Sequence, residues 1–405
     1  MMRATFVCLI IAVLAIFAVP AGADGYDYLI ITHETFYNAV LPLADHYGTG
    51  MTVKVVMTSS IGTAPTASDI ATYIRNDYNA SEPKPKYVLL VGDVGYVPTH
   101  YVTAHDPEAD GTIATDLYYG DMSGDYLPEL CVGRFPVTTA AETTTMVNKS
   151  INYSVMSKKV LLFGSNPEMT YATTHDTTIL SPAGYIVDTV ADAAATSTEV
   201  INRISAGRLL VAYYGHGCTT GMGNLTTTDV TPANFTNTEL PIVASGGCFN
   251  GEFDHTTATS IGEALVLTPN GAIAFVGSTR TGGYGYAYTF LDGFYASMDN
   301  NGTVGDMLNA GRLSAYNAAV AASEPVGDGS WTKSFIEKIN LLGDPAIYPT
   351  PTPICIVGKV LGNESAAADG LRVFRDQVLA RLPNGPELID GYYSVSAAIL
   401  QILQP

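Results

Sequence analysis

The stretch 208–254 constrains the fold most, because it holds two apolar segments of strand length that each end in small residues. These segments, 209–214 and 240–244, have the unbroken apolar character that is typical of strands buried on both faces of a parallel sheet. His216 follows the first segment and Cys248 follows the second. Ligands of open α/β sheets gather beyond the carboxyl ends of the strands. If the two strands are neighbours, an imidazole and a thiol therefore face each other across a crevice.

A thiol opposite an imidazole is the arrangement that a cysteine nucleophile needs, because the base can remove the thiol proton and leave a thiolate. Gly215 and Gly217 flank His216 and let the backbone turn sharply and approach a ligand. A histidine in a cleft can also be purely structural, and this chain has seven. The flanking glycines and the preceding strand pattern favour a catalytic role for His216.

Two other residues compete for these roles. His255 lies seven residues past Cys248, but no strand pattern precedes it. Cys218 lies two residues from His216 on the same loop, and attack geometry is easier across a crevice than within so short a turn. Cys248 is therefore favoured as the nucleophile. Cys131 lies inside a strand pattern and is interpreted as a small core residue.

The rest of the chain alternates strand and helix patterns, which predicts an α/β fold with a mainly parallel sheet covered by helices. Strand patterns occupy 28–32, 52–57, 87–91, 130–135, 159–164, 185–190, 209–214, 240–244 and 272–277. Helix patterns occupy 66–79, 139–153, 176–180, 197–205, 260–267 and 304–316. We expect two closely packed α/β subdomains, 24–155 and 156–348, of which the second carries the chemistry. The polar stretch 219–239 is expected to be a surface loop beside the site.

The two ends of the sequence differ from this pattern. Residues 1–23 combine a basic Arg3, an apolar stretch and small residues before Asp24, which predicts a secretory signal peptide and a secreted or cell-surface protein. An uncleaved anchor is the alternative, and no later segment predicts a membrane span. Residues 349–353 form a Pro-rich spacer, and 354–405 predict a helical tail of unassigned role.

Charge and cysteine content narrow the function further. The formal net charge of −19 argues against nucleic acid or anionic lipid as the main partner. Four of the five cysteines, at positions 131, 218, 248 and 355, lie outside the predicted signal peptide and are too scattered for a dense disulfide framework. A free thiol in a secreted protein needs a reason, and catalysis is one. We expect a monomer.

One acidic segment has spacing that suits a metal ion. Asp121, Ser123, Asp125 and Glu129 follow one another at near-alternating positions, and Gly124 allows a tight turn. Oxygen ligands at such spacing suit a structural Ca²⁺. The pattern lacks the full twelve-residue loop signature, and an ordinary acidic turn capped by its own side chains is the alternative.

Several motifs, in order, resemble those of the gingipain-like cysteine peptidases, family C25, in the clan that also holds caspases and legumains. The motifs are YVLLVGDVGYVP (87–98), TDLYYGD (115–121), ELCVGRFP (129–136), LVAYYGHG (210–217), LPIVASGGCFNGEF (240–253), IGEALV (261–266), AIAFVGSTR (272–280) and LLGDPAIY (341–348). The resemblance covers nearly all of 27–348. It implies a caspase-like three-layer sandwich with a mainly parallel sheet, and a thiol-dependent endopeptidase acting on protein or peptide substrates.

The resemblance also implies roles for single residues. Cys248 is then the nucleophile, His216 is the general base and acid, and the backbone N–H groups of Gly217 and Cys248 form the oxyanion hole. Glu168 fits, with a one-residue offset, the acidic residue that would orient the imidazole. The alternative for Glu168 is an exposed loop carboxylate. These steps require no metal or other cofactor.

Substrate specificity is less defined by the resemblance. Arg-specific members use an acidic residue at the base of the pocket for P1, the substrate residue before the cleaved bond, and Asp176 is the candidate here. Asp176 fits a helix N-cap equally well. The segment 278–288, with Ser278 and Tyr284, is expected to line the pocket wall, where Arg280 would favour an acidic P1 side chain.

Two other functions are compatible with these residues. One is a non-catalytic surface adhesion module on a peptidase-like fold. The other is a transpeptidase, in which an amine replaces water at the thioester. A secreted cysteine endopeptidase is the function that the sequence favours.

Overall fold

The computed structural model describes residues 25–105, 111–154, 157–282, 284–300 and 302–349 of the chain. The predicted signal peptide (1–23), all but the first residue of the predicted spacer, and the predicted helical tail (354–405) lie outside these residues. The side chain of Tyr284 also lies outside them.

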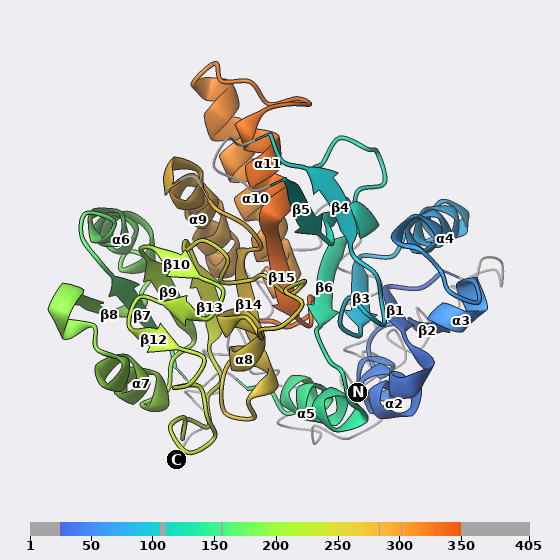
Figure 1. Cartoon of the computed structure of the whole chain (residues 1–405), viewed down its shortest axis with the longest axis horizontal. Coiled ribbons are helices and arrows are strands. Elements are labelled where there is room, and N and C mark those ends of the chain that lie inside the picture. Colours follow the sequence, from blue (N-terminus) through green and yellow to red (C-terminus); the bar gives the residue numbers. More distant parts are fainter. Residues whose placement is uncertain (1–24, 106–110, 155–156, 283, 301, 350–405) are drawn as a thin grey trace, which may run out of the picture.

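The described chain is built around one ten-stranded sheet (Figure 1). Its strand order is β2 (Val53–Met57), β1 (Tyr28–Thr32), β3 (Tyr87–Val91), β6 (Cys131–Phe135), β15 (Ile339–Gly343), β14 (Ala274–Ser278), β13 (Ile242–Ser245), β9 (Leu210–Tyr214), β7 (Lys159–Gly164) and β8 (Ile186–Ala191). Neighbours are parallel within the first flank, β2-β1-β3-β6, and within the second flank, β14-β13-β9-β7-β8. β15 joins the two flanks and is antiparallel to β14.

Helices cover both faces of the sheet and make a three-layer sandwich (Figure 1). One face carries α2 (Tyr37–Tyr47), α5 (Ala140–Ile151), α7 (Ser197–Ser205) and α8 (Ile261–Leu267), and the core on this face runs across both flanks. The other face carries α4 (Ala67–Ala80), α6 (Met169–His175), α9 (Tyr284–Asp299), α10 (Val304–Ala321) and α11 (Trp331–Lys338). This largely parallel architecture confirms the predicted fold class.

The sandwich also carries several shorter elements. They are α3 (Thr58–Ile61), the hairpin β4 (His100–Thr103) and β5 (Thr112–Thr115), the small sheet β10 (Gly217–Cys218), β11 (Gly221–Met222) and β12 (Leu225–Thr226), and the single turns η1 (Glu34–Phe36), η2 (Leu117–Tyr119), η3 (Asp176–Leu180) and η4 (Asp192–Ala194). The predicted surface loop 219–239 differs from expectation, because it contains β11 and β12 and buries Met222, Leu225 and Phe235.

Local sequence signals locate most elements well. The boundaries of every predicted strand agree with those of an observed strand to within two residues. The predicted capping box is present, since the Ser260 hydroxyl accepts from the Glu263 N–H while the Glu263 carboxylate accepts from the Ser260 N–H. The predicted helix 176–180 is a single wide turn that continues α6. No helix of the described chain is both long and apolar enough to cross a membrane.

Candidate active site

The strands that precede His216 and Cys248 are direct neighbours in the sheet. β9 and β13 are parallel, and Tyr213 lies opposite Ser245. The Gly246 N–H donates to the Tyr213 carbonyl at 3.0 Å just beyond this pair. Because both strands end at the same level, the two following loops leave the sheet side by side.

The two loops touch through glycines. A Cβ atom on Gly217 would lie only 2.6 Å from the carbonyl oxygen of Cys248, and a Cβ atom on Gly247 would lie 3.2 Å from the Gly217 Cα. Any side chain at these positions would push the loops apart. His216 is exposed and Cys248 is half-buried, so both are accessible from solvent at this contact.

The side chain of Asn250 joins the two loops through hydrogen bonds. Its buried side-chain amide donates to the carbonyls of Cys218 at 2.8 Å and Gly221 at 2.7 Å, both on the His216 loop. Its Oδ1 accepts from the Ser245 hydroxyl at 2.7 Å. One side chain thus holds the hairpin β10–β11 against the end of β13. Sequence reasoning missed Asn250, because its role depends on partners that are distant along the chain.

The Cys248 thiol lies against the segment that follows β14. The Gly282 N–H donates to Cys248 Sγ at 3.3 Å. Within the described chain, no hydrogen bond uses the backbone N–H of Cys248, so this donor is available to a ligand.

Glu168 lies on the loop beside His216. This loop follows β7, and the Ser165 N–H donates to the Tyr214 carbonyl at 2.9 Å. Glu168 is 8% exposed at the start of α6, so it is not the exposed loop carboxylate of the alternative interpretation. Its orienting role stays a prediction.

With this geometry in place, comparison with known proteins assigns the family. The family model for peptidase family C25 matches residues 22–350. The chain belongs to peptidase family C25. This membership, expected from the motifs, supports a cysteine peptidase, which is a hydrolase.

The relatives are distant and longer. The chain is 24% identical to Lys-gingipain HG66 of Porphyromonas gingivalis over 364 residues, covering 79% of this chain and 20% of that protein. It is 26% identical to gingipain R2 of P. gingivalis (strain ATCC 33277) over 257 residues, covering 57% of this chain and 33% of that protein. The chain therefore spans a third or less of the length of these curated relatives.

The fold is also found in a solved structure. The crystal structure of the Arg specific cysteine proteinase gingipain R matches with a TM-score of 0.69 and 21% identity. The match covers 82% of this chain and 80% of that chain. At this level of identity the likeness establishes the shared fold.

The two rival residues make local contacts. The His255 Nδ1 accepts from the N–H groups of Thr257 and Ala258 at 3.2 and 3.0 Å, which holds the ring in its own turn. Cys218 is exposed, with its Sγ 4.0 Å from the Thr220 hydroxyl. Cys131 is buried as expected, and burial raises the pKa of its thiol.

The candidate calcium ligands are already engaged by the backbone. The Asp121 carboxylate accepts from three successive N–H groups, those of Gly124, Asp125 and Tyr126, at 2.8 to 3.1 Å. The Glu129 carboxylate accepts from the N–H groups of Met122 and Ser123. No group of three or more His, Cys, Asp and Glu residues in the described chain is arranged to hold a metal ion. The contacts are those of a self-capped acidic turn, and a calcium site at Asp121, Ser123, Asp125 and Glu129 stays a prediction.

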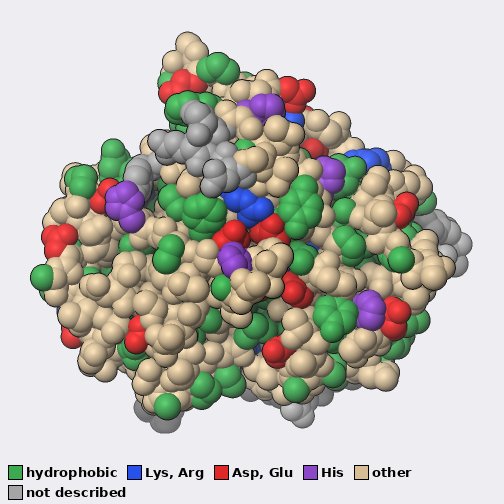
Figure 2. All heavy atoms as spheres, in the orientation of Figure 1, with side chains coloured by type: hydrophobic (Ala, Val, Ile, Leu, Met, Phe, Trp, Pro, Cys, Tyr) green, Lys and Arg blue, Asp and Glu red, His purple; other side chains and the backbone are tan. Residues whose placement is uncertain are grey.

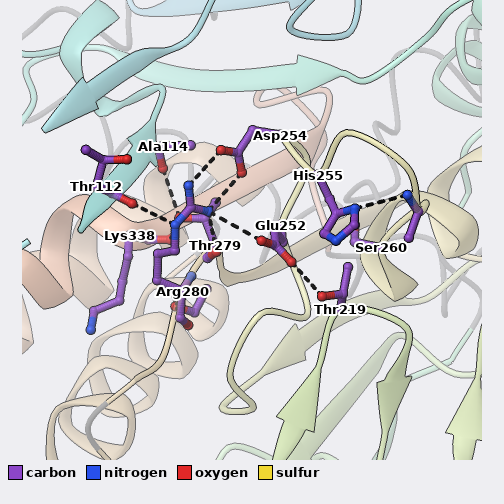
Figure 3. A network of polar contacts seen from close by, with 12 residues as sticks. Thr112, Ala114, Thr219, Glu252, Asp254, His255, Ser260, Thr279, Arg280 and Lys338 are labelled. Carbon is purple, nitrogen blue, oxygen red and sulfur yellow. Dashed lines mark hydrogen bonds and ion pairs between the residues drawn. The ribbon is translucent and has the colours of Figure 1, made fainter. Parts of the chain in front are cut away.

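Arg280 is fully engaged beside the site (Figure 3). Its guanidinium makes a bidentate ion pair with Asp254 at 2.7 and 2.8 Å and donates to the Thr112 carbonyl of β5 at 2.7 Å. Glu252 lies 3.9 Å from it and accepts from the Thr219 hydroxyl on the His216 loop. Arg280 is thus engaged by protein partners, and the expectation that it favours an acidic P1 side chain stays a prediction. Figure 2 shows basic (blue), acidic (red) and histidine (purple) side chains gathered near the centre of the face that it draws.

The remaining specificity candidates occupy different surroundings. Asp176 begins the wide turn after α6, and its carboxylate accepts from the Ser181 hydroxyl at 2.5 Å. The neighbouring His175 is buried, and its ring contacts the Tyr214 hydroxyl at 2.7 Å and Asp292 at 3.1 Å. Ser278 is buried in the wall of a pocket near Cys248, and Tyr284 begins α9.

Proposed function

We propose that this protein is a secreted cysteine endopeptidase that hydrolyses peptide bonds through a thioester on Cys248, with His216 as general base and acid. The observation that carries the proposal is the parallel pairing of β9 with β13, which brings the His216 and Cys248 loops into contact. Membership of peptidase family C25 supports the same chemistry.

The first half of the reaction forms the thioester. His216 accepts the proton of the Cys248 thiol, and the thiolate attacks the carbonyl carbon of the scissile peptide bond. The Gly282 N–H lies 3.3 Å from Sγ and holds the sulfur at this position. Negative charge then develops on the carbonyl oxygen, and the N–H groups of Gly217 and Cys248 are the proposed donors to it. Each such donor contributes about 3–4 kcal/mol of barrier lowering in well-studied cases.

The second half regenerates the enzyme. The His216 imidazolium gives its proton to the leaving amine, and the C–N bond breaks. His216 then takes a proton from water as the water oxygen attacks the carbonyl carbon of the thioester. The C–S bond breaks, the carboxylic acid is released, and the Cys248 thiolate regains a proton from the His216 imidazolium. Glu168, on the adjoining loop, is proposed to orient the imidazole during both proton transfers.

A cleavage assay with matched cysteine variants tests this proposal. The chain from residue 24 is incubated with a peptide library derived from whole proteins, and new termini are identified by mass spectrometry. We expect cleavage by the unmodified chain, none by Cys248→Ala, and full cleavage by Cys218→Ser, whose exposed thiol lies on the neighbouring loop.

Other outcomes distinguish the alternative functions. Equal cleavage by Cys248→Ala, or loss of cleavage in Cys218→Ser alone, would contradict the assignment of the nucleophile. Joined peptides in place of hydrolysed ones would indicate a transpeptidase. Absence of cleavage across the library would favour a binding module. Neither alternative is favoured by the family or the relatives.

A further inference from the structure

A narrow pocket adjoins the Cys248 thiol. Its wall includes Gly246, two residues before Cys248, and Gly282, whose N–H lies 3.3 Å from Cys248 Sγ. Ser278, at the end of β14, also lines it. A substrate carbonyl attacked by this sulfur places its neighbouring side chain close to these same residues. The pocket is therefore positioned to receive the P1 side chain.

The interior of the pocket is apolar. Its deeper wall is formed by Ala287 and Phe290 of α9, Phe335 of α11 and Ile339 of β15, and all four are buried. No charged side chain of the described chain lines it. A guanidinium, ammonium or carboxylate group in such surroundings would lose its hydration without gaining an ionic partner, which is costly.

The polar groups of the pocket wall are already engaged. The Ser245 hydroxyl donates to Asn250 Oδ1 at 2.7 Å and accepts from the Gly247 N–H at 3.0 Å. The Ser278 hydroxyl donates to the Arg280 carbonyl at 2.7 Å. Neither hydroxyl is therefore well placed to solvate a charged group.

The charged candidates near the site are engaged elsewhere. Asp176 accepts a hydrogen bond from Ser181, and Arg280 is held by Asp254. Neither side chain lines the pocket. The two interpretations of a charged P1 preference that the sequence left open thus have no support at this pocket.

The pocket is also small. The space open to the centre of a water molecule is about 10 Å³, which is room for about one water. A Cβ atom on Gly246 would lie 3.9 Å from the Ala287 side chain, so α9 closely backs the substrate side of the pocket. We propose that this pocket selects a small apolar P1 side chain, such as the methyl group of alanine. The proposal rests on the proposed peptidase function and names its substrate class.

A matched substrate series tests the preference directly. Fluorogenic peptides that differ only at P1 carry alanine, valine, leucine, phenylalanine, arginine, lysine or aspartate, and are offered to the full chain. We expect kcat/KM for alanine to exceed that for arginine, lysine and aspartate by about tenfold or more, with lower values for valine, leucine and phenylalanine as size increases. Faster cleavage after a charged or aromatic residue would overturn the preference while leaving the peptidase function intact.

Covalent probes separate this failure from failure of the function itself. Peptidyl acyloxymethyl ketones with P1 alanine or arginine alkylate an active thiol, and intact mass shows whether Cys248 is labelled. We expect faster labelling by the alanine probe and none in Cys248→Ala. Absence of both labelling and cleavage would overturn the peptidase function, and the P1 preference with it.

A matched pair of variants tests the location of the pocket. Ala287→Asp places a carboxylate in the pocket wall, whereas Ala296→Asp makes the same change at an exposed position of the same helix. We expect Ala287→Asp to lower the alanine-to-arginine ratio of kcat/KM by about tenfold or more, and Ala296→Asp to leave it unchanged. If Ala287→Asp fails to fold, Ala287→Leu fills the same space and should reduce cleavage after alanine. An unchanged ratio in folded Ala287→Asp, or unchanged cleavage in Ala287→Leu, would overturn the assignment.

The alternative acid has its own control. Asp176→Asn removes the carboxylate charge outside the pocket, and we expect the P1 profile to stay the same. Loss of cleavage after arginine or lysine in this variant alone would overturn the proposal and make Asp176 the specificity residue.

Discussion

The two flanks of the sheet differ in the residues at the ends of their strands. In the first flank, the Arg134 side chain of β6 is completely buried and makes a bidentate ion pair with Asp116 at 2.6 and 2.7 Å. It also donates to the carbonyls of Gly92 and Val97. In the second flank, glycines at 217 and 247 let the loops after β9 and β13 touch without filling the space above them.

This difference shows which residues at the end of a strand leave room for a ligand. A large side chain whose three nitrogens all donate hydrogen bonds turns the end of the first flank into core. Glycines and a half-buried thiol keep the end of the second flank open to a ligand. The comparison leads to separate expectations, since changes in the first flank should affect stability and changes in the second should affect activity.

The largest effect is expected from His216→Ala. Loss of the proposed base should reduce kcat/KM by on the order of 10³–10⁶-fold. His216 is exposed, so the free energy of unfolding should change by less than about 0.5 kcal/mol. Peptide cleavage and urea denaturation measure the two quantities. His255→Ala serves as the control, and an equal loss of activity in it would contradict the choice of base.

Arg134→Met should produce the opposite result. Removing the guanidinium leaves the Asp116 carboxylate buried without its ionic partner, at a cost of about 3–5 kcal/mol in unfolding free energy. Chemical denaturation measures this loss. Activity per folded molecule should fall far less than in His216→Ala. A stable variant with no activity would show that the sealed flank takes part in the chemistry.

Asn250→Asp tests the connection between the two loops. The substitution keeps the shape but replaces the donor to the Cys218 and Gly221 carbonyls with an acceptor. Misplacement of the two reacting groups should lower kcat by about 10–100-fold. The rate of Cys248 alkylation by iodoacetamide, measured against pH, should change as well. The exposed Asn300→Asp is the control, and an unchanged pH profile in a folded Asn250→Asp would assign Asn250 to stability alone.

The smallest effect concerns pH. Burial raises the pKa of Glu337 in α11 from 4.5 to about 7. The folded state therefore favours the protonated carboxyl, and this contribution to stability is lost as pH rises from about 4.5 to 7. Glu337→Gln should remove this loss. The unfolding free energy of the variant, relative to that of the unmodified chain, should therefore rise by on the order of 1–3 kcal/mol between pH 5 and pH 8. Thermal unfolding at both pH values measures it. The exposed Glu82→Gln should show no such gain, and a parallel pH dependence in Glu337→Gln would contradict the shift.

Local signals explain why much of the fold is predictable from the sequence. The limits of apolar segments such as 28–32 and 159–164 predict the limits of the strands that they form. Ser260 and Glu263, within four residues, mark the start of α8. The placement of His216 and Cys248 after buried strands was predictable for the same reason, whereas the adjacency of β9 and β13 became known only from the structure.

Elements that depend on distant packing were missed. Helix α9 (Tyr284–Asp299) is rich in aromatic residues and glycine and packs into the core, so its sequence lacks a clear polar face. The strand β15 is a short apolar run whose place depends on two partners, β14 and β6, that both lie more than 50 residues earlier in the sequence. The engagement of Arg280 by Asp254, and of Asn250 by the His216 loop, likewise emerges only when separate loops are brought together.

The central place of β15 has a consequence for biosynthesis. Residues 339–343 lie between the two flanks, and Ile339 also lines the pocket beside Cys248. A ribosome must release everything up to this strand before the halves of the nascent polypeptide can be joined. The proposed site should therefore be completed only after residues 339–343 have been synthesised, because the pocket beside Cys248 lacks Ile339 until then.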